Sequence, residues 1–225
     1  MSSDYATAPG AAGVRRARLR RWLGSVLLVL AGSAATALHA LEDGAATRTV
    51  EALHAALARN MADGAALGFE GRLARIEPVL AEVFDFQTIA MVALGDAYAR
   101  LDASQQARFR ALLERQSALT YADNFKSAQH SPRFVTLAEQ PARGARVVVR
   151  TRLERDDGAP VSLDYVVHDT ARGPRVVNVL AEGVSDLSLK RAQYAAVIRR
   201  DGVDALLEQI EKQVTELAHT AAGSG

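Results

Sequence analysis

The fold is decided by the stretch PRVVNVLAEGVSDLSLKRAQY, which runs from Pro174 to Tyr194. Its first part is rich in β-branched residues and ends at Gly183, and an amphipathic helical pattern begins after Ser185. Glycine tolerates the backbone of a tight corner, and Ser185 or Asp186 is well placed to cap the helix that follows. The stretch therefore predicts a strand that turns directly into a helix.

Three further strands are predicted upstream, at Arg133 to Glu139, Arg146 to Arg155 and Val161 to His168. They join the strand Val176 to Ala181, with turns at Asp157-Gly158 and Arg172-Gly173-Pro174. Alternation places one set of side chains on an inner face: Val147, Val149, Thr151, Leu153, Val161, Leu163, Tyr165 and Val167. The other face carries Arg146, Arg150, Arg152, Glu154, Ser162, Asp164 and His168. We expect an antiparallel four-stranded sheet with one apolar face.

Helical spacing predicts four helices before the sheet and two after it. The first two helices run from Thr47 to Met61, with Gly64 ending the pattern, and from Leu67 to Val83, with a kink or a new start at Pro78. A short helix from Asp85 to Leu94 ends at Gly95, and a long helix runs from the capping box at Asp102 to about Phe125. The last two helices run from Asp186 to Arg200 and from Val203 to Ala218, and they are joined at Asp201-Gly202. The buried stripe of the long helix is predicted to be Phe109, Leu112, Gln116 and Leu119.

An apolar sheet face needs a cover, and helices laid over it leave a wedge between the layers. The expected fold class is therefore α+β, an antiparallel four-stranded sheet covered on one face by helices in an NTF2-like or cystatin-like wedge. Residues 41–219 are predicted to form a single domain, after a disordered N-terminus and signal peptide at residues 1–40 and before a loose tail at residues 220–225.

The N-terminal region has the layout of a secretory signal peptide. An arginine cluster between Arg15 and Arg21 precedes an uncharged run of 17 residues, Trp22 to Leu38, and Ala35-Thr36-Ala37 offers a cleavage site. A retained membrane anchor and a buried helix are the alternatives, since a membrane span needs about 20 residues. The signal predicts a periplasmic protein.

Composition excludes several classes of function. The chain has no cysteine, which rules out disulfides, thiol catalysis and thiolate metal sites. Five of its 27 basic residues lie in the arginine cluster, so that the rest of the chain, without Asp4, has 22 basic and 25 acidic residues. A nucleic-acid partner is not expected, because such proteins keep their basic excess in the folded part. No cofactor is predicted.

No catalytic motif is present. The sequence has no HExxH, GxSxG, P-loop or GxGxxG, and its five histidines are scattered. Asp156-Asp157 fits a hairpin turn better than an ion site, and Asp164 with His168 fits a solvated sheet surface better than a dyad. We therefore do not expect an enzyme.

Together with FDFQTIAMVALG (Phe84 to Gly95), the deciding stretch resembles the MlaC family of periplasmic lipid-binding proteins, also called the toluene-tolerance auxiliary family. The resemblance continues through Gln105-Gln106, Asn178-Val179, Arg191 and the last helix, and VVNVLAEGVSDLSLKRAQY is most similar to the hopanoid-associated, HpnM-like branch. One position departs from the pattern, since Pro174 stands where the family usually has tryptophan.

This resemblance implies a carrier that shuttles lipid, phospholipid or hopanoid, between an inner-membrane ABC transporter complex and an outer-membrane lipid complex. It implies tails in a cavity between sheet and helices, with the head group at the mouth. The candidate cavity residues are Leu94, Tyr98, Phe109, Leu112, Val147, Val149, Leu153, Val161, Leu163, Tyr165 and Val167, each of which also fits an ordinary core. Arg150, Arg152 and Arg191 are candidates for head-group binding or docking, with a surface ion pair as the alternative for Arg191.

Two rival functions stay open. An NTF2-like enzyme would need polar groups inside the cone, where the inner positions supply only Thr151 and Tyr165. A lipid-free interaction adaptor would use the arginine-rich outer face and would have a tightly packed core.

Overall fold

Helix α1 (Ala45–Val83) begins the part of the chain that our computed structural model describes, residues 44–126, 133–155 and 158–223. The helix bends at Gly68, whose φ of 60° and ψ of −178° are not helical. The break predicted at Gly64 is wrong. Gly64 lies inside the helix, where an added Cβ would lie 1.8 Å from the carbonyl oxygen of Lys126, so its role is close packing. Pro78 lies within the second half without interrupting it.

The next three elements are helix α2 (Phe86–Leu94), the 3₁₀ turn η1 (Gly95–Arg100) and helix α3 (Ala103–Asn124). Both predicted N-caps are confirmed. The Asp85 carboxylate accepts from the amide of Thr88 at 3.0 Å, and Asp102 and Gln105 form a reciprocal capping box at 2.8 and 3.2 Å. Gly95 ends α2 with φ 55°, as predicted.

The sheet has five antiparallel strands in sequence order, β1 (Arg133–Ala142), β2 (Arg146–Glu154), β3 (Val161–His168), β4 (Arg175–Ala181) and β5 (Val184–Ser185). The four predicted strands are confirmed, but the predicted number of strands is wrong. β5 was missed because two residues are too few to show alternation. The turn after β3 closes with Thr170 and Gly173 bonding each other's backbone, while Asp157 of the other predicted turn lies outside the described residues.

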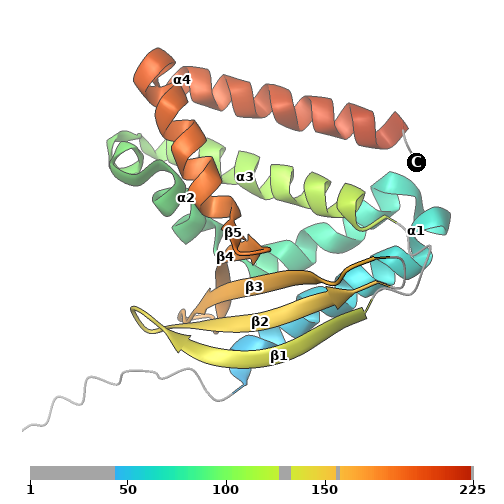
Figure 1. Cartoon of the computed structure of the whole chain (residues 1–225). Helices are drawn as coiled ribbons and strands as arrows, with labels where there is room; N and C mark the ends of the chain where they lie inside the picture. Colours follow the sequence, from blue (N-terminus) through green and yellow to red (C-terminus); the bar gives the residue numbers. More distant parts are fainter. Residues whose placement is uncertain (1–43, 127–132, 156–157, 224–225) are drawn as a thin grey trace, which may run out of the picture. The chain divides into compact units, whose positions relative to one another are not determined.

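Helix α4 (Asp186–Gly223) completes the chain and bends at Gly202, where φ is 87°. The predicted joint at Asp201-Gly202 is therefore confirmed, and the helix extends into the segment 220–225 that we expected to be loose. Its first half rises from β5 away from the sheet, and its second half runs along α3 (Figure 1). All described residues belong to one compact unit, Leu38–Gly225.

The first half of α1 covers one end of the inner sheet face. It contacts β1 to β4, and Val149, Val167 and Val176 beneath it are 0% exposed. The buried polar side chains of His54 and Thr151 have hydrogen-bond partners here. The His54 ring lies 3.0 Å from the Tyr165 hydroxyl and stacks on Phe134, and the Thr151 hydroxyl donates to the Leu163 carbonyl at 2.7 Å. This end of the sheet is a packed core.

Helices α3 and α4 rise over the other end of the same face (Figure 1). α3 packs on α1 and on α4, and α4 contacts β4. No helix among the described residues combines the length and apolar character that crossing a bilayer requires.

Candidate functional site

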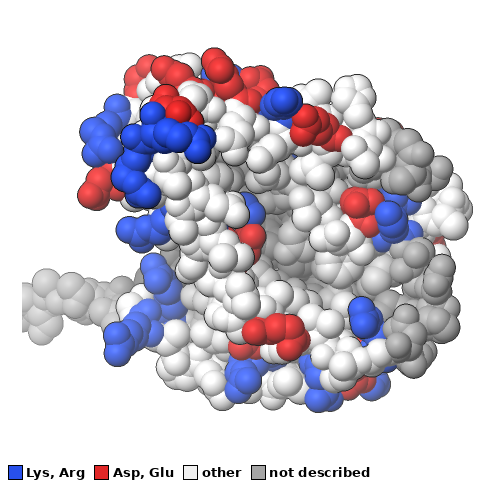
Figure 2. Space-filling view, turned by 45° about the horizontal axis from the view of Figure 1, so that its top comes forward, with Lys and Arg blue, Asp and Glu red and all other residues white. Residues whose placement is uncertain are grey.

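A pocket of about 420 Å³ lies between the open end of the sheet, α3 and the start of α4. Its lining is mainly apolar and aromatic: Phe84, Phe86, Ile89, Leu113, Gln116, Ser117, Thr120, Tyr121, Asn124, Phe125, Leu163, Tyr165, Val177, Asn178, Val179, Ala181, Val184, Asp186, Leu187, Leu189 and Lys190. The space-filling view shows this face hollowed, with uncharged residues forming most of the walls (Figure 2). We call this space the apolar pocket.

Strands β3 and β4 supply one wall of the apolar pocket. Tyr165 pairs with Val179 and Leu163 pairs with Ala181, so that strand alternation points all four side chains to the inner face. Because the strands continue past the region that α1 covers, the same face is buried at one end and lines a pocket at the other.

The tight turn between β4 and α4 determines where α4 lies at the mouth of the apolar pocket. Gly183 has φ 77°, and the Asn178 side-chain oxygen accepts from the Ser185 hydroxyl at 3.1 Å and from the Leu187 amide at 3.4 Å. The Ser185 hydroxyl in turn accepts from the amide of Ser188 at 3.0 Å, which makes Ser185 the cap of α4. These bonds fix the direction in which α4 leaves the sheet.

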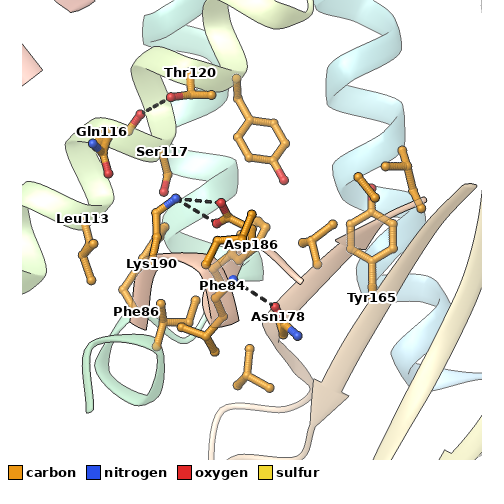
Figure 3. A pocket seen from close by; sticks show the side chains of 18 of the residues that line it. Phe84, Phe86, Leu113, Gln116, Ser117, Thr120, Tyr165, Asn178, Asp186 and Lys190 are labelled. Atoms are coloured by element: carbon orange, nitrogen blue, oxygen red, sulfur yellow. Dashed lines mark hydrogen bonds and ion pairs between the residues drawn. The ribbon is translucent and has the colours of Figure 1, made fainter. Parts of the chain in front are cut away.

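The charged residues of the lining are Asp186 and Lys190, which form an ion pair at 2.8 Å (Figure 3). Tyrosine hydroxyls are protonated at neutral pH, and burial raises the pKa of Tyr121 and the pKa of Tyr165 further, with smaller contributions from Asp186 and from Tyr121 respectively. The lining of the apolar pocket therefore has no net charge, because Asp186 and Lys190 neutralise each other. The exposed side chains of Val184 and Leu189 also belong to this lining.

Two of the predicted cavity residues, Leu163 and Tyr165, line the apolar pocket. The other nine lie elsewhere. Val147, Val149, Leu153, Val161 and Val167 belong to the sheet outside the lining, and Leu94, Tyr98, Phe109 and Leu112 belong to α2, η1 and α3 outside the lining. Tyr98 accepts a hydrogen bond from Gln87 at 2.9 Å, and Phe109 meets Tyr194 edge to face.

The three candidate arginines lie outside the apolar pocket. Arg150 lies 3.7 Å from Asp164, and Arg152 pairs with Glu154 at 2.7 Å, both on the outer sheet face. Arg191 is exposed on α4, with its guanidinium close to Gly95.

Asp164 and His168 do not form a dyad, because Asp164 faces Arg150 while His168 bonds Asp85 at 2.9 Å. Burial opposes ionisation of Asp85, but the bonds from Thr88 and His168 outweigh it and lower the pKa of its carboxyl. Among the described residues no cluster of histidine and carboxylate groups could hold a metal ion. The mainly apolar lining of the pocket suits the binding of an apolar molecule.

Sequence reasoning missed the wall that β4 supplies, because the apolar run of that strand shows no alternation, and it also missed the walls that the helices supply. The pocket-facing side of α3 presents Leu113, Gln116, Ser117 and Thr120, and the first turn of α4 presents Leu187. The predicted stripe of α3 did include Gln116, but no local pattern distinguishes a helix face that closes a core from one that lines a pocket.

A family model described as MlaC protein matches residues 48–212, which is most of the chain. The chain belongs to the MlaC family. A phospholipid-binding protein from Ralstonia solanacearum, solved in complex with a phospholipid, has a similar structure, with a TM-score of 0.68 and 21% identity over 80% of this chain and 99% of that one. No curated protein matches the sequence. The predicted MlaC resemblance is thus confirmed at the level of the family and the α+β fold.

Proposed function

We propose that this MlaC family protein is a lipid carrier that holds lipid tails in the apolar pocket. The observation that carries the proposal is a neutral, mainly apolar pocket of about 420 Å³ that opens beside exposed apolar residues. Membership of the MlaC family and the phospholipid bound by the similar Ralstonia solanacearum protein support the proposal.

The physics of such a pocket suits a carrier. Each methylene group removed from water contributes about 0.8 kcal/mol, and a diacyl lipid has on the order of thirty of them. Release into water is therefore extremely slow, whereas transfer to a bilayer or to another binding protein keeps the tails dry. The lipid is expected to leave only at a partner.

The cargo is a phospholipid or a hopanoid, and the HpnM-like stretch Val176 to Tyr194 favours the hopanoid-associated branch. In this proposal the lipid tails lie in an NTF2-like wedge between the sheet and the helices. The assignment of the other nine candidate residues to the lipid-binding cavity stays a prediction.

The proposed route runs through the periplasm, from an inner-membrane ABC transporter complex to an outer-membrane lipid complex or in the reverse direction. Export would use the predicted signal peptide, which lies outside the described residues. The proposed docking surface is the outer sheet face with Arg150 and Arg152. If reversal of both charges leaves the rate of lipid transfer to acceptor membranes carrying the partner complex unchanged, the docking proposal is wrong.

Filling the apolar pocket tests the carrier proposal directly. Ser117 lines the pocket from α3, and a Ser117→Trp variant would occupy its volume. We expect uptake of fluorescent lipid from vesicles to fall at least about tenfold, since displacing two methylene groups already removes about 1.6 kcal/mol. Ala111→Trp is the matched control, because Ala111 is exposed on the same helix and does not line the pocket. Equal uptake by both variants would contradict the proposal.

A further inference from the structure

Two hydroxyl groups on α3, those of Ser117 and Tyr121, line the apolar pocket and make no hydrogen bond within the described part of the chain. Neither oxygen is among the fully buried side-chain atoms without partners, so both are accessible. Thr120 on the same helix differs, because its hydroxyl donates to the Gln116 carbonyl at 2.8 Å (Figure 3). The apolar pocket thus offers two hydroxyl donors that the protein itself does not use.

Other aromatic rings of the pocket hold the Tyr121 ring in place. It stacks on Phe125, with the ring centroids 5.7 Å apart, and meets Phe84 edge to face at 6.0 Å. Burial raises the pKa of Tyr121 and Asp186 adds to this effect, while Tyr121 adds to the effect of burial on the pKa of Tyr165. Because Asp186 begins α4 and Tyr165 belongs to the sheet, the Tyr121 hydroxyl is directed into the space between these two walls.

Ser117 and Tyr121 are four residues apart, which places their side chains one turn apart on the same face of α3, with about 5–6 Å between the Cβ atoms. The two ester groups of a diacyl glycerolipid are attached to neighbouring carbon atoms, and the carbonyl oxygen of each accepts hydrogen bonds only. Moving such a carbonyl into an apolar pocket is unfavourable unless a donor meets it there. A hydroxyl group is a suitable donor. The two hydroxyls therefore match the two esters in number and in chemistry.

We propose that Ser117 and Tyr121 donate hydrogen bonds to the ester carbonyl oxygens of the carried lipid, and that these contacts select ester-linked glycerolipids over ether-linked ones. The inference rests on the proposed carrier function and adds the linkage that the cargo contains. A hopanoid, which lacks this pair of ester carbonyls, would leave both hydroxyls without a partner. Of phospholipid and hopanoid, the two hydroxyls therefore favour a diacyl phospholipid, with its tails deeper in the apolar pocket and its head group toward the mouth.

A competition between two phospholipids that differ only in these carbonyl groups tests the selection. The delipidated full-length protein is incubated with vesicles that contain equal amounts of diacyl and dialkyl-ether phosphatidylglycerol with chains of equal length. The bound lipids are then extracted and quantified by mass spectrometry. We expect the diacyl lipid to be enriched about tenfold, which corresponds to about 1.4 kcal/mol and is the size expected for two neutral hydrogen bonds. Equal binding, or enrichment of the ether lipid, would overturn the inference and leave the carrier function intact.

A double variant, Ser117→Ala with Tyr121→Phe, assigns the preference to the two hydroxyls. It removes only two oxygen atoms from the lining, so it should still bind lipid while the enrichment falls to within about twofold of the vesicle composition. Each single variant should keep an enrichment of about threefold. The matched control is Ser104→Ala with Tyr194→Phe, because neither residue lines the apolar pocket, and it should keep the enrichment of the wild-type protein.

The variants also define the results that contradict the inference. A double variant that keeps the full enrichment would overturn it, and so would a control pair that loses the enrichment. A wild-type protein that binds neither lipid would contradict the carrier function itself.

Discussion

The two ends of the inner sheet face use similar residues and have different environments. Under α1, Val149 and Val167 are 0% exposed and pack into a solid core. At the other end, Leu163 and Val179 point to the same face but are only half buried, and they line the apolar pocket. The difference comes from the covering helices, since α1 lies on the sheet while α4 leaves it at the Gly183 corner. A pocket is thus made by the path of the chain rather than by a special sequence in its wall.

The largest contrast is expected from the same truncation at each end. Leu53→Ala removes a side chain of α1 that is 0% exposed, and it should lower the free energy of unfolding by about 2–5 kcal/mol. Leu163→Ala at the pocket should cost about 1 kcal/mol of stability and reduce lipid affinity about fivefold. Urea unfolding and vesicle uptake measure the two effects. Equal losses of stability would mean that the two ends are packed alike.

Acid should lower the stability of the protein at the end of the sheet that α1 covers. Burial lowers the pKa of His54 from its ordinary value of 6.5 to about 4, so the unfolded chain binds a proton that the folded protein excludes. Stability should therefore be complete above pH 6.5 and fall by about 3 kcal/mol as the pH drops to about 4. His54→Gln should remove this part of the pH dependence in unfolding experiments, and His219→Gln, at an exposed position, should keep it. An unchanged slope in His54→Gln would contradict the neutral, buried state of the imidazole.

Alanine substitutions at two glycines distinguish the effect of backbone strain on stability from the effect of pocket shape on lipid uptake. Gly183 has φ 77° and Gly144 in the β1–β2 turn has φ 71°, so alanine at either position should cost about 1–2 kcal/mol of stability. Only Gly183→Ala should also slow lipid uptake, because Gly183 sets the direction of α4 at the mouth. Thermal unfolding and vesicle uptake on both variants check this. Equal uptake by the two variants would contradict a role of the Gly183 turn in shaping the apolar pocket.

The smallest effect is expected on the outer face. Reversing Arg150 and Arg152 to glutamate breaks half-exposed ion pairs with Asp164 and Glu154, and such pairs contribute at most about 1 kcal/mol. Unfolding by urea should therefore shift little, and lipid uptake from protein-free vesicles should stay unchanged. A large loss of uptake would show that the outer face influences the apolar pocket.

The strands and helix caps could be predicted because their signals are local. Alternation gave β2 and β3 their correct faces, and Asp85 and Asp102 lie where a cap was expected. The bend of α1 could not be predicted, since Gly64 and Gly68 are equivalent as residue types. Gly64 stays helical because it packs against the carbonyl of Lys126, a contact distant in sequence.

Only a small part of the lining of the apolar pocket could be identified from the sequence. Leu163 and Tyr165 were identified from the strand pattern, whereas Leu113 and Ser117 depend on which side of α3 faces the open end of the sheet. That orientation follows from the bends at Gly68 and Gly202, which place the helices relative to the sheet. Tertiary geometry of this kind leaves no periodic trace in the sequence.

The most direct test of lipid binding in the apolar pocket is native mass spectrometry of the full-length protein purified from its host, together with the Ser117→Trp variant. We predict that the wild-type protein carries a co-purifying lipid, which extraction identifies, and that the variant has the mass of the polypeptide alone. A wild-type protein with only the polypeptide mass, and with no uptake from labelled vesicles, would contradict the account and favour an adaptor without lipid.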